Sequence, residues 1–156
     1  MKPPKPSEDD RRVGWKLYAQ GHAMAWKGRW SEAEALFAQA AQLMPDASLT
    51  WLSGAIACYQ QSKFTEAGNA IQWALQVIPT LSTPESEAGV TYAESEDWIG
   101  VERAFRGLLA KGSPETATHL FLAIALMNLG RLPEAFDQLM AGYNLEIAGA
   151  GAATDA

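Results

Sequence analysis

The sequence predicts an all-α protein built from four tandem helix pairs, and three observations lead to that prediction. A short pattern, Gly-Arg-Trp-Ser-Glu-Ala at 28–33, returns as Ser-Lys-Phe-Thr-Glu-Ala at 62–67 and, two further periods along, as Gly-Arg-Leu-Pro-Glu-Ala at 130–135. Apolar residues recur at helical spacing over 51–59 and 120–127. Helix-start signals accompany these segments. A fixed period of this length is the signature of a repeat architecture.

Four units of equal length fit the chain without an insertion, at 14–47, 48–81, 82–115 and 116–149. The third unit is degenerate. Its slot at 96–101 reads Glu-Asp-Trp-Ile-Gly-Val, which keeps the large aromatic residue and a small aliphatic one but loses the Glu-Ala pair. We therefore expect the third helix pair to be the irregular one.

Cap signals and apolar spacing place eight helices on this register. Ser31 and Glu34 have capping-box spacing, and Thr83-Pro84-Glu85 and Ser113-Pro114-Glu115 put a cap residue, a proline and an acid in the order that a helix start prefers. The expected helices are 12–27, 31–44, 48–61, 65–78, 84–94, 97–111, 114–128 and 132–146. The repeat domain then covers 12–147, between a basic, proline-rich leader at 1–11 and an Ala/Gly tail at 148–156, both expected to be disordered.

These units resemble the tetratricopeptide repeat (TPR) family, whose unit, about 34 residues long, is a pair of antiparallel helices. The family expects small residues at positions 8 and 20 of each unit and bulky ones at 17 and 24, which fill the space between helices. The small residues are Gly21, Ala55, Gly89 and Ala123 at position 8 and Ala33, Ala67, Val101 and Ala135 at position 20. The bulky residues are Trp30, Phe64, Trp98 and Leu132 at position 17 and Phe37, Ile71, Phe105 and Leu139 at position 24. The resemblance covers most of the chain and implies a right-handed superhelical solenoid of about four repeats.

Composition excludes several classes of function. The formal net charge of -6 disfavours nucleic-acid binding, which needs a clustered excess of Lys and Arg. The single cysteine, Cys58, cannot form an internal disulfide, and two histidines are too few for a Cys/His metal cluster. The longest apolar run, at 120–127, is too short to span a bilayer, and the charged, proline-containing start does not read as an export signal. We expect a cytoplasmic protein without cofactor or metal.

The resemblance implies that the first helix of each repeat lines a concave groove. It assigns the groove ten apolar, aromatic or polar residues: Trp15, Tyr18, His22, Trp26, Leu52, Ile56, Tyr59, Val90, Ile124 and Met127. An aromatic groove suits an amphipathic helix or an extended protein segment with apolar anchors. The alternative is that some of these residues, Leu52 and Ile124 among them, belong to the core. The basic clamp that some repeats of this family use for carboxylate-terminated tails is absent, since Tyr18, His22, Ser53, Thr83 and Glu87 occupy its positions.

Two further features bear on partners. Phe136, Met140 and Tyr143 form one stripe on the last expected helix, which predicts a surface for self-association or for a partner, unless these residues fold back onto the fourth unit. The third unit concentrates acids, at Glu85, Glu87, Glu94, Glu96 and Asp97, which form either a charged contact site or a solvated face.

Catalysis is disfavoured by the candidate residues themselves. Cys58 falls in a helix-packing position with no base predicted beside it, and His119 falls at a packing position as well. We therefore expect a non-enzymatic scaffold or adaptor that binds a protein segment and can self-associate. The alternatives are a bacterial secretion chaperone of the type III class, which would hold an export substrate, and a fragment of a longer repeat array.

Overall fold

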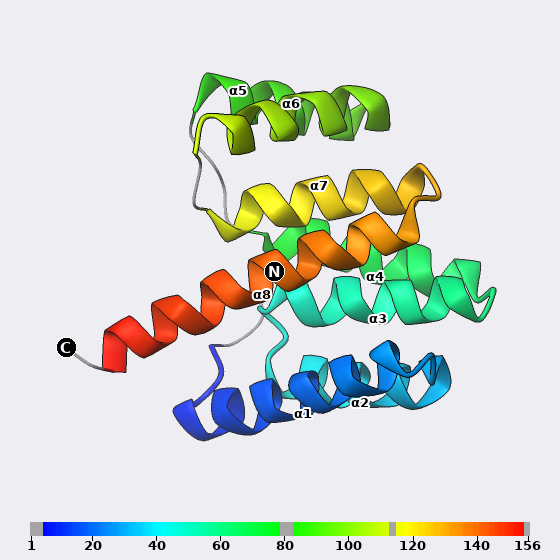
Figure 1. Ribbon diagram of the computed structural model, residues 1–156, viewed down its shortest axis with the longest axis vertical. Helices are drawn as coiled ribbons and strands as arrows, with labels where there is room; N and C mark the ends of the chain where they lie inside the picture. Colours follow the sequence, from blue (N-terminus) through cyan, green and yellow to red (C-terminus); the bar gives the residue numbers. More distant parts are fainter. Residues whose placement is uncertain (1–4, 79–82, 113–114, 155–156) are drawn as a thin grey trace. The chain divides into compact units, whose positions relative to one another are not determined.

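The computed structural model describes residues 5–78, 83–112 and 115–154. Over these ranges the chain forms eight α-helices and no strand, which confirms the predicted all-α class (Figure 1). Their bounds are α1 Glu8–Trp26, α2 Trp30–Leu43, α3 Ser48–Gln60, α4 Phe64–Val77, α5 Pro84–Glu94, α6 Trp98–Ala110, α7 Thr116–Asn128 and α8 Leu132–Thr154. The chain divides into two compact units, Met1–Ile78 with α1 to α4 and Pro79–Ala156 with α5 to α8.

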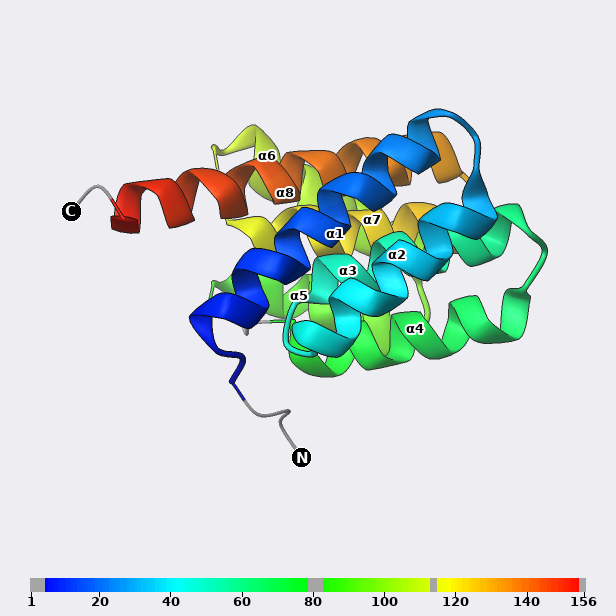
Figure 2. The ribbon, with the colours of Figure 1, turned by 90° about the horizontal axis from the view of Figure 1, so that it is seen from below.

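The helices of each unit pack in chain order. In the first unit α2 packs on α1, α3 on α2 and α4 on α3, and in the second unit α5 to α8 follow the same scheme. Each unit is therefore two consecutive helical hairpins, α1–α2 and α3–α4 in the first and α5–α6 and α7–α8 in the second (Figure 1 and Figure 2). Four helix pairs in a repeat pattern are what the period of the sequence predicts.

The turn inside each hairpin has one geometry, which recurs at the same position of every repeat. Its central residue has a left-handed backbone, with φ of 73° at Gly28, 61° at Ser62, 57° at Glu96 and 78° at Gly130. The residue after it donates its backbone N–H to the carbonyl of a residue in the last turn of the helix: Arg29 to Met24, Lys63 to Cys58, Asp97 to Tyr92 and Arg131 to Leu126, at 2.8–2.9 Å. This is the Schellman-type helix ending. The turn of the third pair is thus as regular as the others, although its sequence is degenerate.

The two helices of a pair pack closely at the small residue of position 8. A Cβ added to Gly21 would lie 2.6 Å from a ring carbon of Phe37, and one added to Gly89 would lie 2.5 Å from a ring carbon of Phe105. The other two pairs carry alanine at this position, opposite the smaller Ile71 and Leu139. Small residues and bulky residues therefore compensate each other in volume.

Helix starts differ in part from the sequence prediction. The capping box at Ser31 and Glu34 is wrong, because α2 begins at Trp30 without a side-chain cap. The start at Thr83 is confirmed: Thr83 Oγ1 accepts from the Ser86 N–H at 3.2 Å, and Ser86 Oγ accepts from the Thr83 N–H at 3.1 Å. The signal at Ser113-Pro114 lies outside the described residues, and α7 is helical from Thr116.

Both ends of the chain contain more helix than we expect from composition. α1 begins at Glu8, where Ser7 Oγ accepts from the Asp10 N–H at 3.1 Å and the acids of the first turn face the positive end of the helix dipole. α8 runs to Thr154, through most of the Ala/Gly tail expected to be disordered. Alanine has the highest helix propensity of all residues, so an alanine-rich segment can extend a helix without large apolar anchors.

Replacing Gly89 by alanine should destabilise the protein, because the new Cβ would meet the fully buried ring of Phe105. Overpacking of this kind costs about 1–3 kcal/mol. The matched control is Gly107→Ala on α6, where the new Cβ would meet no atom within 4 Å apart from its chain neighbours and the backbone of its own helix. That control should gain about 0.5–1 kcal/mol from helix propensity. Urea denaturation followed by circular dichroism measures both, and equal midpoints in the two variants would contradict the close crossing.

Candidate protein-interaction surfaces

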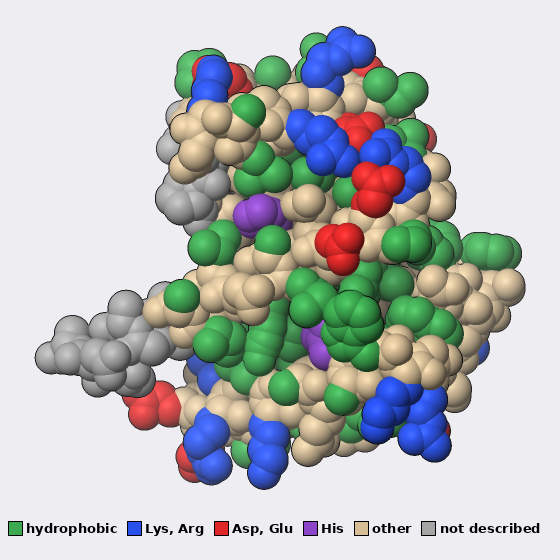
Figure 3. Space-filling view, in the orientation of Figure 1, with side chains coloured by type: hydrophobic (Ala, Val, Ile, Leu, Met, Phe, Trp, Pro, Cys, Tyr) green, Lys and Arg blue, Asp and Glu red, His purple; other side chains and the backbone are tan. Residues whose placement is uncertain are grey.

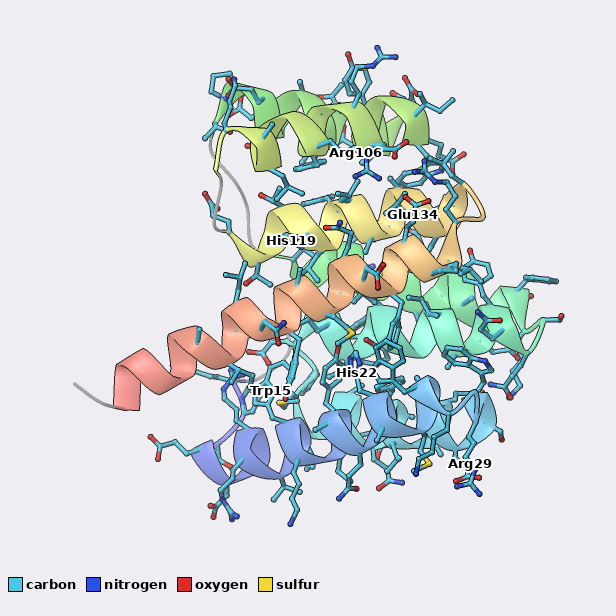
Figure 4. All side chains as sticks on the ribbon, in the orientation of Figure 1. Trp15, His22, Arg29, Arg106, His119 and Glu134 are labelled. Carbon is cyan, nitrogen blue, oxygen red and sulfur yellow. The ribbon has the colours of Figure 1, made fainter. Side chains whose placement is uncertain are left out.

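The middle of α1 carries an aromatic cluster of Trp15, Tyr18 and His22. The ring of Tyr18 stands edge-on to that of Trp15, with centroids 5.4 Å apart, and lies 4.5 Å from the ring of His22. Phe37 of α2 contacts both Tyr18 and His22, with its centroid 5.4 Å from the first and 5.7 Å from the second. The hydroxyl of Tyr18 hydrogen-bonds to Ser53 Oγ of α3 at 2.8 Å. The cluster therefore ties α1 to α2 and α3; Trp15 and His22 are labelled in Figure 4.

His22 is buried within this cluster. Its residual exposure is 9%, and burial lowers the pKa of its imidazole from 6.5 to about 4. The ring is therefore neutral at physiological pH, because burial removes the hydration that the charged form needs. His22 acts here as a polar packing residue of the first unit rather than as a cation presented to a ligand.

The ends of α1 and α3 lie on the same side of the first unit (Figure 1), and large aromatic side chains remain exposed at or next to these ends. Trp26, the last residue of α1, is 69% exposed. Tyr59 near the end of α3 is half-buried and lies 6.1 Å, centroid to centroid, from Phe64 of α4, which is 64% exposed. We call Trp26, Tyr59 and Phe64 the aromatic end of the first unit.

The other predicted groove residues differ widely in exposure. Trp15 and Val90 are half-buried. Tyr18, Leu52, Ile56, Ile124 and Met127 are at most 2% exposed. The burial of Leu52 and Ile124 agrees with the alternative that these two residues belong to the core. Membership of a groove stays a prediction for all ten residues, and among them Trp26, at 69%, is the one that the structure leaves fully on the surface.

The stripe predicted on α8 is half-buried at Phe136, Met140 and Tyr143. The residue one period before Phe136 is Glu102 of α6, and the residue two periods before it is Gly68 of α4. The residue one period before Met140 is Arg106 of α6. Glu102 and Arg106 reach the following helix pair: Glu102 pairs with Arg131 at 2.8 Å, and Arg106 with Glu134 at 3.3 Å. Figure 4 labels Arg106 and Glu134 of this network. Figure 3, in the same orientation, shows Lys or Arg and Asp or Glu side chains gathered in this part of the second unit.

A groove on the α5–α6 hairpin has no counterpart in our sequence analysis. Its cavity measures about 400 Å³ and is lined by Ala88 and Tyr92 of α5 and by Ile99, Arg103, Ala104 and Gly107 of α6. Lys111 Nζ and Glu85 Oε1, 2.9 Å apart, close one end. We call this surface the α5–α6 groove. The signal for it in the sequence was Ile99, an apolar residue where the other pairs have Ser31, Thr65 and Pro133.

The residues considered for catalysis take part in packing, in hydrogen bonds or in a turn. Cys58 is a free, buried thiol whose pKa is raised to about 11, first by burial and then by the charge of Glu34. His119 Nδ1 lies 2.8 Å from Gln138 Oε1 of α8. Of the acids in the third pair, Glu96 forms the left-handed turn and Asp97 accepts from the Gly100 N–H at 3.0 Å.

The described ranges contain neither a cluster of metal ligands nor a membrane-spanning helix. No group of three His, Cys, Asp or Glu side chains in those ranges could hold a metal ion. Nor does any helix there combine the length and the apolar character that crossing a bilayer requires.

Two units built from hairpins of one shared period define the chain as a helical-repeat protein. No family model matches it, and no curated protein sequence matches it either. Among solved structures, it is similar to a crystal structure of MamA, with a TM-score of 0.43 and 14% identity over 88% of this chain and 81% of that one. A P212121 structure of MamA AMB-1 gives a TM-score of 0.38 and 21% identity over 85% and 73% of the two chains. A likeness at this level concerns the helical architecture alone.

The neutral, buried His22 makes stability depend on pH. Because its pKa is about 4 in the folded protein and near 6.5 in an exposed chain, the unfolded state binds the extra proton as the pH falls through this window. The contribution of neutral His22 to the free energy of unfolding is therefore fully present above about pH 6.5. About 2 kcal/mol of this contribution is lost between pH 7 and pH 5. Urea denaturation at pH 7, 6 and 5 measures the loss, which His22→Gln should remove and His119→Gln should retain. Parallel pH dependences in wild type and His22→Gln would contradict this assignment.

Proposed function

We propose that this protein is a non-enzymatic interaction scaffold or adaptor of the TPR type, which binds a segment of another protein. The observation that carries the proposal is the aromatic end of the first unit, where Trp26 is 69% and Phe64 is 64% exposed. A large aromatic side chain offers about 150–250 Å² of surface, and burying it is worth about 25 cal/mol per Å². Each of the two residues therefore holds a few kcal/mol of binding free energy for a partner.

The fold presents these side chains on a rigid support. The buried hydrogen bond between Tyr18 and Ser53 joins α1 to α3, and the Schellman turns at Gly28 and Ser62 fix both helix ends. A surface fixed before binding loses less conformational entropy when a partner docks. This supports an amphipathic helix or an extended segment with apolar anchors as ligand, in contact with Trp26 and Tyr59.

The chemistry of the candidate nucleophile favours a binding role. A buried thiol with a raised pKa is protonated at neutral pH, whereas nucleophilic cysteines need a lowered pKa and partial exposure. A lone free cysteine also suits a reducing compartment, so we propose the cytoplasm as its location. A secretion chaperone of the type III class would use the same aromatic surface for an export substrate, and it remains the alternative within this proposal.

Trp26→Ala should remove most binding to peptides selected on the wild-type protein. The experiment selects from a displayed library of random peptides on the immobilised full chain and then measures each enriched peptide by fluorescence anisotropy. A central aromatic anchor is worth at least about 2 kcal/mol, so affinity should fall by about thirtyfold. The matched control is Gln42→Ala, an exposed position on α2. Unchanged affinity in Trp26→Ala, with helicity preserved in both variants, would refute the assigned surface.

We also propose that the protein self-associates through α8. The support is positional: in α6 the residues at the places of Phe136 and Met140 contact the next helix pair through ion pairs, whereas the last pair carries apolar side chains there. Apolar residues at positions that reach a neighbouring pair favour a contact with another copy or with a partner. Tyr143 lies on the same side of α8 by its spacing.

Light scattering on the full chain tests this contact. The wild type should have a mass well above the 16.9 kDa of one chain, and the double variant Phe136→Glu/Met140→Glu should return to the mass of a monomer. Asp137→Ala, at an exposed position of the same helix, is the control and should leave the mass of the assembly unchanged. A monomeric wild type would leave the aromatic end as the proposed interface and remove α8 from the proposal.

A further inference from the structure

We propose that the outer face of α1 is a second docking site, which receives a helix of a partner protein and pairs a carboxylate of that helix with Lys27 and Arg29. The inference rests on the proposed role in protein binding and gives that role a site besides the aromatic end. By helical spacing, the outer face of α1 is the side that carries Val13, Leu17, Gln20, Ala23, Met24 and Lys27.

Inside the first unit, α2 packs on α3 and brings a carboxylate to the next hairpin. Glu34 Oε1 accepts from Gln61 Nε2 at 2.7 Å and from Lys63 Nζ at 2.9 Å. Further along α3, a Cβ placed on Gly54 would lie 3.8 Å from the Cβ of Phe37 of α2. The contact therefore combines an anchored carboxylate near the turn with close packing of the two helices.

The second unit repeats this contact between α6 and the α7–α8 hairpin. Glu102 corresponds by two periods to Glu34, and Arg131 corresponds to Lys63. The two carboxylate oxygens of Glu102 accept from Arg131 Nη1 at 2.8 and 3.0 Å. Arg131 also pairs with Glu134 of its own hairpin at 2.7 Å. A glutamate that arrives from the preceding pair is thus common to the contacts of both units.

The α1–α2 hairpin has the receiving half of the same contact. Arg29, labelled in Figure 4, has the place in this hairpin that Arg131 has in the last one. It pairs with Glu32 of its own hairpin at 3.3 Å, and its side chain is 55% exposed, against 40% for Arg131. Lys27, which is exposed, has the place of Gln61. Two cations therefore stand where the α3–α4 hairpin offers one amide and one cation to a carboxylate.

The outer face of α1 also keeps residues on which a helix can pack. Ala23 is exposed, whereas its equivalents Ala57 and Ala125 are fully buried. Val13 is 39% exposed and Met24 is half-buried. An alanine lets a second helix approach closely, and the valine and methionine beside it add apolar surface that docking would bury.

Charge on this face favours an acidic partner. Residues 11–31 contain five basic side chains and no acid, and the two at 11 and 12 are in ion pairs. The other three, Lys16, Lys27 and Arg29, are accompanied by one acid, Glu32, so the net charge is three minus one, or +2. The acids of the first turn lie about 25 Å from Lys27 along the helix. A basic helix would be repelled here and an acidic one attracted.

The second helices of this chain do not supply the missing carboxylate. Glu34 and Glu102 are held inside their own units. The other two second helices, α4 and α8, have Gly68 and Phe136 at this position. The occupant is therefore a helix of another protein, with Glu or Asp at this position and small or apolar residues on the same side.

A peptide with the sequence of 30–44 is the probe, because α2 makes this contact with α3 and carries Glu34. A lactam bridge between Ala35→Lys and Gln39→Glu, both at exposed positions of α2, holds the free peptide in a helix. The labelled peptide is titrated with the full chain by fluorescence anisotropy. It should bind, and amide NMR of the full chain should show shifts within 13–29.

Charge reversal tests the carboxylate contact. Lys27→Glu/Arg29→Glu in the full chain should weaken binding about tenfold, because two attractions become repulsions. A peptide with Glu34→Lys should bind the wild type more weakly and recover affinity toward the reversed chain, which also shows that this variant is folded. Lys5→Glu/Arg103→Glu changes two other exposed cations by the same net charge and should keep affinity within about twofold.

Four results would overturn the proposal. The first is no binding at concentrations up to about 1 mM. The second is equal affinity in wild type and Lys27→Glu/Arg29→Glu, and the third is no recovery with the reversed peptide. The fourth is a mass that rises with concentration and that the reversal abolishes, which would make a second copy the occupant. None of these results removes the proposed function, because binding at the aromatic end is measured with selected peptides and responds to Trp26→Ala.

Discussion

The closeness with which two helices cross inside each pair is the constraint on which the rest of the structure depends. At Gly21 and Gly89 the crossing leaves no room for a Cβ, because a phenylalanine ring of the second helix fills the space. Where the first helix has alanine instead, the second carries isoleucine or leucine, so the volume of the contact is conserved while its parts vary. Every other packing surface is built on the spacing that this contact sets.

The left-handed turn sets the rotation of the second helix about its own axis, which the close crossing of the two helices does not determine. Because the turn has the same hydrogen bonds in all four pairs, a given position in each pair points in the same direction. This equivalence makes Glu102 and Arg106 of α6, whose ion pairs reach the next helix pair, the counterparts of Phe136 and Met140 on α8. The surfaces proposed for binding are thus consequences of a backbone motif rather than of any single side chain.

The sequence predicts the helix pairs because small, bulky and turn residues recur at one period. It fails where structure depends on backbone geometry that several residue types can adopt. Glu96 takes a left-handed conformation that glycine would adopt more readily, and nothing in its neighbours signals that the third turn is regular. Ser31 has the spacing of a cap, yet α2 starts one residue earlier. The α5–α6 groove was missed for another reason: its signal, the apolar Ile99 where the other pairs have Ser31, Thr65 and Pro133, is a single residue.

The burial along α5 implies that stability is distributed unevenly over the chain. In its 11 residues only Ser86 and Gly89 are buried, whereas α7 buries most of its length, from Ala117 to Met127. Little apolar surface holds α5 in place beyond the contact of Gly89 with Phe105 and the capping box at Thr83. Local opening should therefore need less free energy at α5 than at α7, on the scale that amide hydrogen exchange resolves. The helix that forms one wall of the groove should then shift its position at a lower free-energy cost than α7.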